Sequence, residues 1–294
     1  DEVGSRGLGD VYKRQLFNLF NDPAILDLPT FLRYPLAKLI SNRRAPVAKK
    51  IYAELGGSSP ILKLTREQSD ALEIKLNQTQ EEDEYKCFII MRCWNPRAKD
   101  VIKDVQLYGP DEVVLMPLYP QYSAATSGSS IKEWKDVCRK NNYHVKTSTI
   151  CCYPTDQNFI NAHTKEIIKK IKDLKNFKLI FSAHGLPEKN IKKGDPYQWQ
   201  VEQSVKKIVE NLNDENLDWI LSYQSRVGPL KWIGPSTETI IIENSKIGKH
   251  IVLVPIAFVS EHSETLVELD IEYKEIADAN GCKNYTRVPA LGIN

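Results

Sequence analysis

The chain has 294 residues, of which 41% are apolar, enough to build one large or two medium-sized α/β domains. Its 40 Lys and Arg side chains nearly balance 38 Asp and Glu side chains, which leaves a formal net charge of +2. This balance argues against a nucleic-acid-binding protein, which usually carries a concentrated basic excess. No apolar run reaches the roughly 18 residues that would predict a transmembrane helix.

The first 15 residues fit none of the usual N-terminal signals. They contain no apolar core of a signal peptide, and their glycines are not spaced as in a dinucleotide-binding fingerprint. We therefore treat residues 1–15 as a leader. The six cysteines are scattered without a Cys-x-x-Cys pair, which favours reduced thiols in a cytosolic protein over a zinc site or a disulfide framework.

Residues 16–40 are rich in Leu, Ile and Phe but are interrupted by Pro23, Pro29 and Pro35. Because proline breaks a helix interior, we expect short helical pieces here and not one long helix. The apolar surface of these pieces either packs into the core or forms a lip over a flat ligand or a membrane surface.

Strand and helix patterns alternate along the rest of the chain. Strands are predicted at 85–91, 112–116, 143–150, 178–181, 219–223 and 250–258. Helices are predicted at 62–76, 97–107, 130–140, 156–174, 196–212, 237–244 and 263–280. This alternation indicates parallel sheets, and its two series suggest two doubly wound halves that meet near residues 150–155.

A histidine follows one of these strands directly. The apolar run 178–181 leads through Ser182 and Ala183 to His184 and Gly185. Ligands of open α/β sheets bind at the carboxyl ends of strands, and imidazole can bind a metal or accept a proton near neutral pH. A histidine that only satisfies a hydrogen bond at a strand end is the alternative.

Four glutamates follow the strand predicted at 250–258. Glu261, Glu264, Glu268 and Glu272 would share about an 80° arc of one α-helix. They could form a solvated face, or they could hold a cation and pass protons along a line. The segment begins at a strand's carboxyl end, as His184 does, which favours a labile metal site.

Five segments of the chain resemble one known family. They are residues 18–25 (NLFNDPAI), 57–61 (GSSPI), 182–187 (SAHGLP), 223–229 (YQSRVGP) and 264–273 (ETLVELDIEY). In this order they are similar to ferrochelatases. The resemblance implies an α/β fold of two similar Rossmann-like, chelatase-type halves, each a parallel sheet flanked by helices, with the active site in the cleft between them. The halves would cover residues 16–152 and 153–294.

The resemblance also implies roles for individual residues. His184 and Glu264 would be the catalytic and metal-binding residues, with Glu264 across the porphyrin from His184. Glu268 and Glu272 would form an acidic path for protons or metal. The residues implied to bind porphyrin are Arg44, Tyr52, Ser59, Arg92, Gln224 and Trp232.

The implied activity is that of a lyase that inserts Fe²⁺ into protoporphyrin IX, the last step of protohaem synthesis. Iron would be a substrate, no tightly bound cofactor is expected, and no cysteine cluster after Cys282 supports an iron–sulfur centre. The enzyme would be cytoplasmic, with peripheral contact to the inner membrane through residues 16–40. The alternatives are a chelatase for another tetrapyrrole or metal, such as coproporphyrin or cobalt, and a non-catalytic two-lobed tetrapyrrole-binding protein.

The chain departs from the family pattern at several points. Residues 1–15 show no first strand with a Leu-Gly-Gly-Pro loop, and the usual Gly-Gly-Gly-Ser-Pro is Gly-Gly-Ser-Ser-Pro at 56–60. The usual Arg-Tyr-Trp-His-Pro is Arg-Cys-Trp-Asn-Pro at 92–96. We also expect a truncated C-terminus, because the terminal helix of the family is missing.

Overall fold

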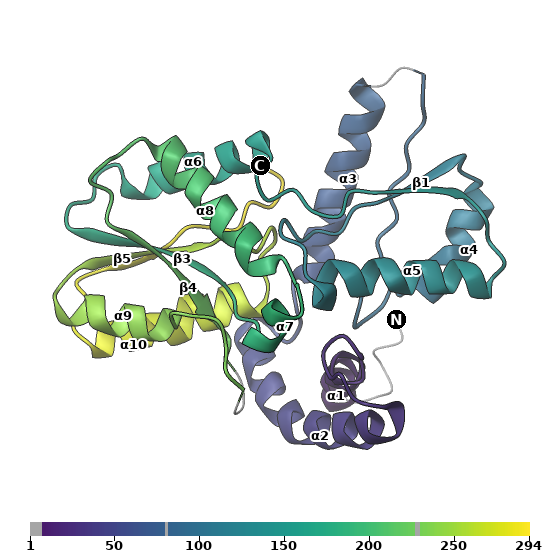
Figure 1. Cartoon of the computed structure of the whole chain (residues 1–294), viewed down its shortest axis with the longest axis horizontal. Coiled ribbons are helices and arrows are strands. Elements are labelled where there is room, and N and C mark those ends of the chain that lie inside the picture. Colours follow the sequence, from purple (N-terminus) through teal and green to yellow (C-terminus); the bar gives the residue numbers. More distant parts are fainter. Residues whose placement is uncertain (1–7, 80–81, 227–229) are drawn as a thin grey trace. The chain divides into compact units, whose positions relative to one another are not determined.

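A computed structural model describes residues 8–79, 82–226 and 230–294 (Figure 1). The fold is α/β, with parallel sheets flanked by helices, as the sequence predicts. The chain divides into two compact units. Unit 1 comprises Asp1–Met116 and Ala124–Thr149, and unit 2 comprises Pro117–Ser123 and Ile150–Asn294.

Unit 2 is built on a sheet of four parallel strands in the order β4-β3-β5-β6. The strands are β3 (Phe177–His184), β4 (Trp219–Gln224), β5 (His250–Pro255) and β6 (Tyr285–Arg287). The first three confirm strands predicted from the sequence, and β6 was not predicted. With only three residues, β6 is too short to show a pattern of alternation.

Helices cover both faces of this sheet because its central strands are apolar on both sides. On β3, Leu179 and Phe181 join the core formed with α6 (Gln157–Ile171) and α8 (Tyr197–Leu212). The intervening Ile180 packs with α9 (Thr237–Lys246) and α10 (Tyr273–Ala279). Figure 1 shows these two helix pairs on opposite faces of the sheet. The period-two alternation of side chains therefore fixes the layers.

Unit 1 contains a smaller parallel pair, β1 (Glu112–Leu115) and β2 (Lys146–Thr149). Helices α4 (Ala98–Tyr108) and α5 (Ser129–Lys140) supply its buried core, which includes Ile102 and Trp134.

The strand predicted at 85–91 is wrong, because no β-ladder includes these residues in the described parts of the chain. Side chains of α3 (Ile61–Thr79) bond the backbone there instead. Glu73 accepts from the Cys87 N–H at 2.7 Å, and Asn77 accepts from the Tyr85 N–H at 2.9 Å. Two backbone N–H groups of this segment are therefore bonded by side chains of α3 and not by a neighbouring strand.

The expectation of short helical pieces at 16–40 holds only in part: the helix is interrupted between Phe20 and Thr30, around Pro23 and Pro29, but not at Pro35. Helix α2 runs over 25 residues, Thr30–Glu54, through Pro35 and Pro46. Each proline removes one intrahelical hydrogen bond, but packing against α1 (Leu8–Phe20) offsets that loss. Tyr12 stacks on Tyr52 with ring centroids 4.8 Å apart. Part of the expected leader therefore belongs to a helical hairpin, α1–α2, and residues 1–7 lie outside the described residues.

The helix predicted at 263–280 is present, but its first half is not α-helical. Residues Glu264–Glu272 form a π-helix, η3, in which the Tyr273 N–H bonds to the Glu268 carbonyl five residues earlier. Helix α10 continues from Tyr273. π-helical turns are rare and often mark functional sites. Short elements absent from the prediction are the π-turn η2 (Ala124–Gly128) and helix α7 (Glu188–Lys192). Among the described residues, no helix combines the length and apolar character needed to cross a membrane.

Candidate active site

Three neighbouring strands of unit 2 deliver polar side chains to one edge of the sheet. Strand β3 ends at His184, which is in register with Gln224 at the end of β4. Strand β5 leads into η3, which begins at Glu264. Parallel strands place their carboxyl ends at a common edge, so the sequence spacing brings these groups together.

Gly185 allows the chain to leave β3 closely against its neighbours. Its N–H donates to the Gln224 carbonyl at 2.9 Å. A Cβ atom at this position would lie 2.9 Å from that carbonyl oxygen and 3.2 Å from the Trp232 ring. A larger residue would push the strand end away, so Gly185 helps to fix His184.

His184 and Glu264 form a direct pair, with Nδ1 of the imidazole 2.8 Å from Oε2 of the carboxylate. With Nδ1 bonded, Nε2 is the ring atom that can accept a proton or bind a metal ion. Because 41% and 33% of these side-chain surfaces remain exposed, the pair can exchange protons with solvent.

The pairing shifts the pKa of both groups. Burial by itself lowers the pKa of His184, but the charge and hydrogen bond of Glu264 outweigh it, so this pKa lies above its usual 6.5. Burial by itself raises the pKa of Glu264, but the charge and hydrogen bond of His184 lower it to about 2. The arrangement therefore combines an ionised carboxylate with an imidazole of increased basicity.

Glu268 is held in place by several donors. Its carboxylate accepts from the Ser225 N–H at 3.0 Å, the Ser225 hydroxyl at 2.6 Å and the Tyr273 hydroxyl at 3.1 Å. The buried Gln224 amide accepts from Ser182 at 2.7 Å and donates to Glu268 at 3.3 Å. Burial raises the pKa of Glu268, the Ser225 bond opposes this, and the Glu264 charge adds to it, so the net shift is upward. The hydrogen bond from the Gln224 amide thus helps to orient the Glu268 carboxylate.

The remaining glutamates of the predicted stripe have different surroundings. Glu272 is exposed at the end of η3. Glu261 precedes η3 and does not share its face: it bonds Arg287 at 2.8 Å and the Ala290 N–H at 2.9 Å. The prediction of four glutamates on one helix face is therefore wrong for Glu261. That residue lies before η3 and binds Arg287 of β6 instead.

His262, which no sequence pattern singled out, adjoins the pair. Its Nε2 lies 4.0 Å from Oε1 of Glu264, and its ring lies 4.6 Å from that of Phe258. Burial lowers the pKa of His262, which favours its neutral form. Its position two residues before Glu264 was the available signal. Among the described residues, no group of three or more His, Cys, Asp or Glu side chains is arranged to hold a metal ion.

Of the six residues implied to bind porphyrin, Gln224 and Trp232 belong to unit 2, and the other four lie in unit 1. Helix α2 carries Arg44, whose guanidinium lies 5.7 Å from the Phe20 ring centroid, and Tyr52, which stacks on Tyr12. Ser59 follows α2, and its hydroxyl lies 3.4 Å from the Ile61 N–H.

Arg92 lies in a different part of unit 1, beyond α3. It forms ion pairs with Asp22 and Glu133.

The parallel-sheet fold of this chain has counterparts among solved structures. The fold is similar to that of SirB from Bacillus subtilis solved with Fe³⁺, with a TM-score of 0.55 and 12% identity over 78% of this chain and 84% of that one. A second structure, the sirohydrochlorin chelatase SirB from Bacillus subtilis subspecies spizizenii in complex with cobalt, gives a TM-score of 0.52 with 13% identity, over 79% and 83%. These likenesses concern the fold alone.

The chain belongs to the ferrochelatase family, whose profile matches residues 5–294. It is 90% identical to a ferrochelatase of Pelagibacter ubique, over 95% of this chain and 81% of that protein. It is 50% identical to a ferrochelatase of Rickettsia felis, over 99% and 83%. A ferrochelatase of Hyphomonas neptunium is 47% identical, over 99% and 82%. The protein is thus an enzyme of the lyase class that inserts a metal ion into a porphyrin.

Proposed function

We propose that this enzyme inserts Fe²⁺ into protoporphyrin IX to form protohaem, with His184 and Glu264 as the reacting protein groups. The observation that carries this proposal is the 2.8 Å contact between His184 Nδ1 and Glu264 Oε2 at the carboxyl edge of the sheet. Family membership supports iron and porphyrin as substrates.

The reaction requires a proton acceptor. Fe²⁺ and the porphyrin give the iron porphyrin and two protons, because both pyrrole N–H groups must lose their proton as the metal enters. Neutral His184 accepts a proton at Nε2, and Glu264 stabilises the imidazolium that forms. Glu268 and Glu272, four and eight residues further along η3, would carry protons or metal between the pair and solvent.

The metal-holding group must also release its ion. An imidazole nitrogen and carboxylate oxygens suit a ferrous ion, and so small a set of donors binds it weakly enough for transfer. Nε2 of His184 would accept the pyrrole proton only after the ion has left it. Fe²⁺ is a substrate in this scheme, and we propose that no tightly bound cofactor takes part.

An anaerobic insertion assay tests the proposed function. Purified protein is mixed with Fe²⁺ and protoporphyrin IX, and the absorbance change from free to metallated porphyrin is followed. We expect catalytic turnover. Binding of porphyrin without metallation would contradict the proposal and leave a binding protein, whereas turnover with coproporphyrin or with cobalt alone would reassign the substrate.

Arg44 is proposed to bind a porphyrin propionate, because its planar guanidinium suits a carboxylate. We expect Arg44→Ala to raise the KM for porphyrin more than it lowers kcat, since the reacting groups are untouched. Lys49→Ala removes an exposed positive charge from the same helix and serves as the matched control. An unchanged KM in Arg44→Ala would place the propionate elsewhere.

We also propose that the enzyme is cytoplasmic and touches the inner membrane through residues 16–40. Helix α2 exposes large apolar side chains, among them Phe31, which is 75% exposed, with Leu32, Tyr34 and Leu39. Co-flotation with lipid vesicles measures this contact. Flotation that persists after Phe31→Ser and Leu32→Ser would contradict a role for this surface.

A further inference from the structure

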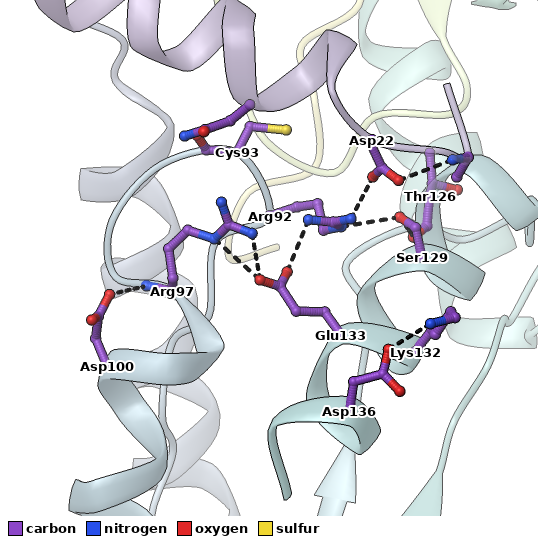
Figure 2. Close-up of polar contacts among 12 residues, drawn as sticks. Asp22, Arg92, Cys93, Arg97, Asp100, Thr126, Ser129, Lys132, Glu133 and Asp136 are labelled. Atoms are coloured by element: carbon purple, nitrogen blue, oxygen red, sulfur yellow. Dashed lines mark hydrogen bonds and ion pairs between the residues drawn. The ribbon is translucent and has the colours of Figure 1, made fainter. Parts of the chain in front are cut away.

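Arg92 is enclosed by acidic partners in unit 1. Figure 2 shows its guanidinium directed at Asp22, Ser129 and Glu133. The nitrogen–oxygen distances are 2.5 Å to Asp22 and 3.0 Å to Glu133. Glu133 also binds Arg97 at 2.5 Å. Asp22 is nearly fully buried, with 4% of its side chain exposed.

The charges in this cluster cancel. Asp22 and Glu133 supply two negative charges, and Arg92 and Arg97 supply two positive charges. The Asp22 and Glu133 carboxylates already accept from the N–H groups of Arg92. A porphyrin propionate approaching Arg92 would be repelled by these two negative charges. Arg92 is therefore poorly suited to bind an anionic ligand group.

The cluster instead links segments that are distant in the sequence. Asp22 lies in the connection between α1 and α2, and Glu133 lies on α5. Next to Arg92, the Cys93 carbonyl accepts from the Asn18 side chain of α1 at 2.9 Å. The hydrogen bonds thus fasten the α1–α2 hairpin to the body formed by α4 and α5.

We propose that Asp22, Arg92 and Glu133 form an ionic latch that positions the α1–α2 hairpin on the α4–α5 body, and that Arg92 serves this latch and does not anchor porphyrin. The hairpin carries Arg44 and Tyr52, so the latch sets where these groups meet the substrate. This last step rests on the proposed function, whereas the latch itself does not.

Hydrogen exchange of the full chain, followed by mass spectrometry, tests the latch without any substrate. Asp22→Asn keeps the side-chain shape but removes the charge that Arg92 binds. We expect peptides from α1 and α2 to exchange faster, by roughly five-fold or more, while peptides from β3 and β5 stay unchanged. Asp136→Asn is the matched control, because Asp136 pairs with the exposed Lys132 (Figure 2) and also with the exposed Arg139, both on α5.

A double-mutant cycle distinguishes a latch from general loss of stability. If Asp22 and Arg92 act through each other, Asp22→Asn combined with Arg92→Gln should change exchange in the hairpin no more than the larger single change. Unchanged hairpin exchange in Asp22→Asn, or additive effects in the double variant, would overturn the latch. If Asp22→Asn fails to fold, Glu133→Gln, which leaves Asp22 in place, provides the same test.

The insertion assay then tests the positioning role. Breaking the latch should raise the porphyrin KM by roughly five-fold or more and leave kcat close to that of the parent. A merely destabilised enzyme would lose kcat at unchanged KM, and that result would overturn the positioning role. Arg92→Lys keeps the positive charge but lacks the planar guanidinium that reaches both carboxylates. Its KM should therefore lie between that of the parent and that of Arg92→Gln. Failure of the unmodified enzyme to turn over would refute the proposed function and leave the exchange result standing.

Discussion

Replacing His184 by alanine should reduce ferrous insertion by about 10²–10⁴-fold, the usual loss when a general base is removed. The reason is geometric. His184 presents one ring nitrogen to Glu264 at 2.8 Å and keeps the other for the substrate. We expect porphyrin binding, measured by fluorescence titration, to change little, because most of the binding energy of a flat apolar ring comes from contact area.

The matched control for this variant is His144→Ala, which removes an exposed histidine that bonds Asn142 in unit 1. It should insert iron at the parental rate. Added imidazole should restore part of the activity of His184→Ala, because a small base can occupy the vacated space. Activity of His184→Ala within a few-fold of the parent would remove His184 from the mechanism.

The strands of unit 2 that the sequence predicts correctly are marked by apolar runs. In β3 and β5, buried residues face both helix layers, so a continuous apolar run marks each strand. Residues 85–91 have a similar apolar character, but a strand also needs a partner strand. Here the side chains of Glu73 and Asn77 bond two of the backbone N–H groups instead. Whether a neighbouring strand is available for pairing depends on the tertiary structure, and the local sequence pattern does not predict it.

The same distinction applies to α2. Proline rules predict helix breaks at Pro35, because they count the lost hydrogen bond and steric clash of an isolated helix. Stacking of Tyr12 on Tyr52 and the edge contact of Phe17 with Tyr34 involve residues far apart in the chain. Tertiary packing of this kind overrides local propensity.

For the site, the sequence predicts that His184 and Glu264 lie at strand ends, which parallel strands bring to one edge. It does not predict their direct 2.8 Å contact, since the family resemblance puts the two residues on opposite sides of the porphyrin. It does not predict the ion pairs of Arg92. Asp22, Arg92 and Glu133 are separated by 70 and 41 residues, and no local rule connects them. A charged residue's partners decide whether it binds a ligand or the protein itself, and those partners become visible only in the folded chain.

Replacing Glu264 by glutamine should nearly abolish insertion at neutral pH while the side-chain shape is retained. The ionised carboxylate raises the pKa of His184 and stabilises the imidazolium formed during reaction. Without that charge the pKa of His184 falls, because burial then dominates. In the parent, kcat/KM should rise with pH through a pKa above 6.5, as His184 loses its proton. In Glu264→Gln, the small residual activity should also rise with pH, but the midpoint of that rise should be shifted to lower pH.

Stability should follow the same pair with a defined sign. The raised pKa of His184 stabilises the folded state most fully below pH 6.5, and this contribution is lost as the pH rises through the folded pKa. The lowered pKa of Glu264 stabilises above pH 4.5, and this contribution is lost as the pH falls toward about 2. The Tm of Glu264→Gln should therefore fall furthest below that of the parent between pH 4.5 and pH 6.5, where both contributions are present. The difference should correspond to about 1 kcal/mol or less, because the pair is partly exposed.

Variants along η3 and α10 separate the Glu264 charge from a general effect of removing acidic groups. Glu268→Gln and Glu272→Gln should slow insertion partially, since these residues lie four and eight positions further along η3 and are proposed to form a path to the pair. Glu275→Gln removes an exposed charge from α10 and should behave as the parent. Near-parental activity of Glu264→Gln with an unshifted pH profile would show that its charge does not act on His184, and the pair would then be structural.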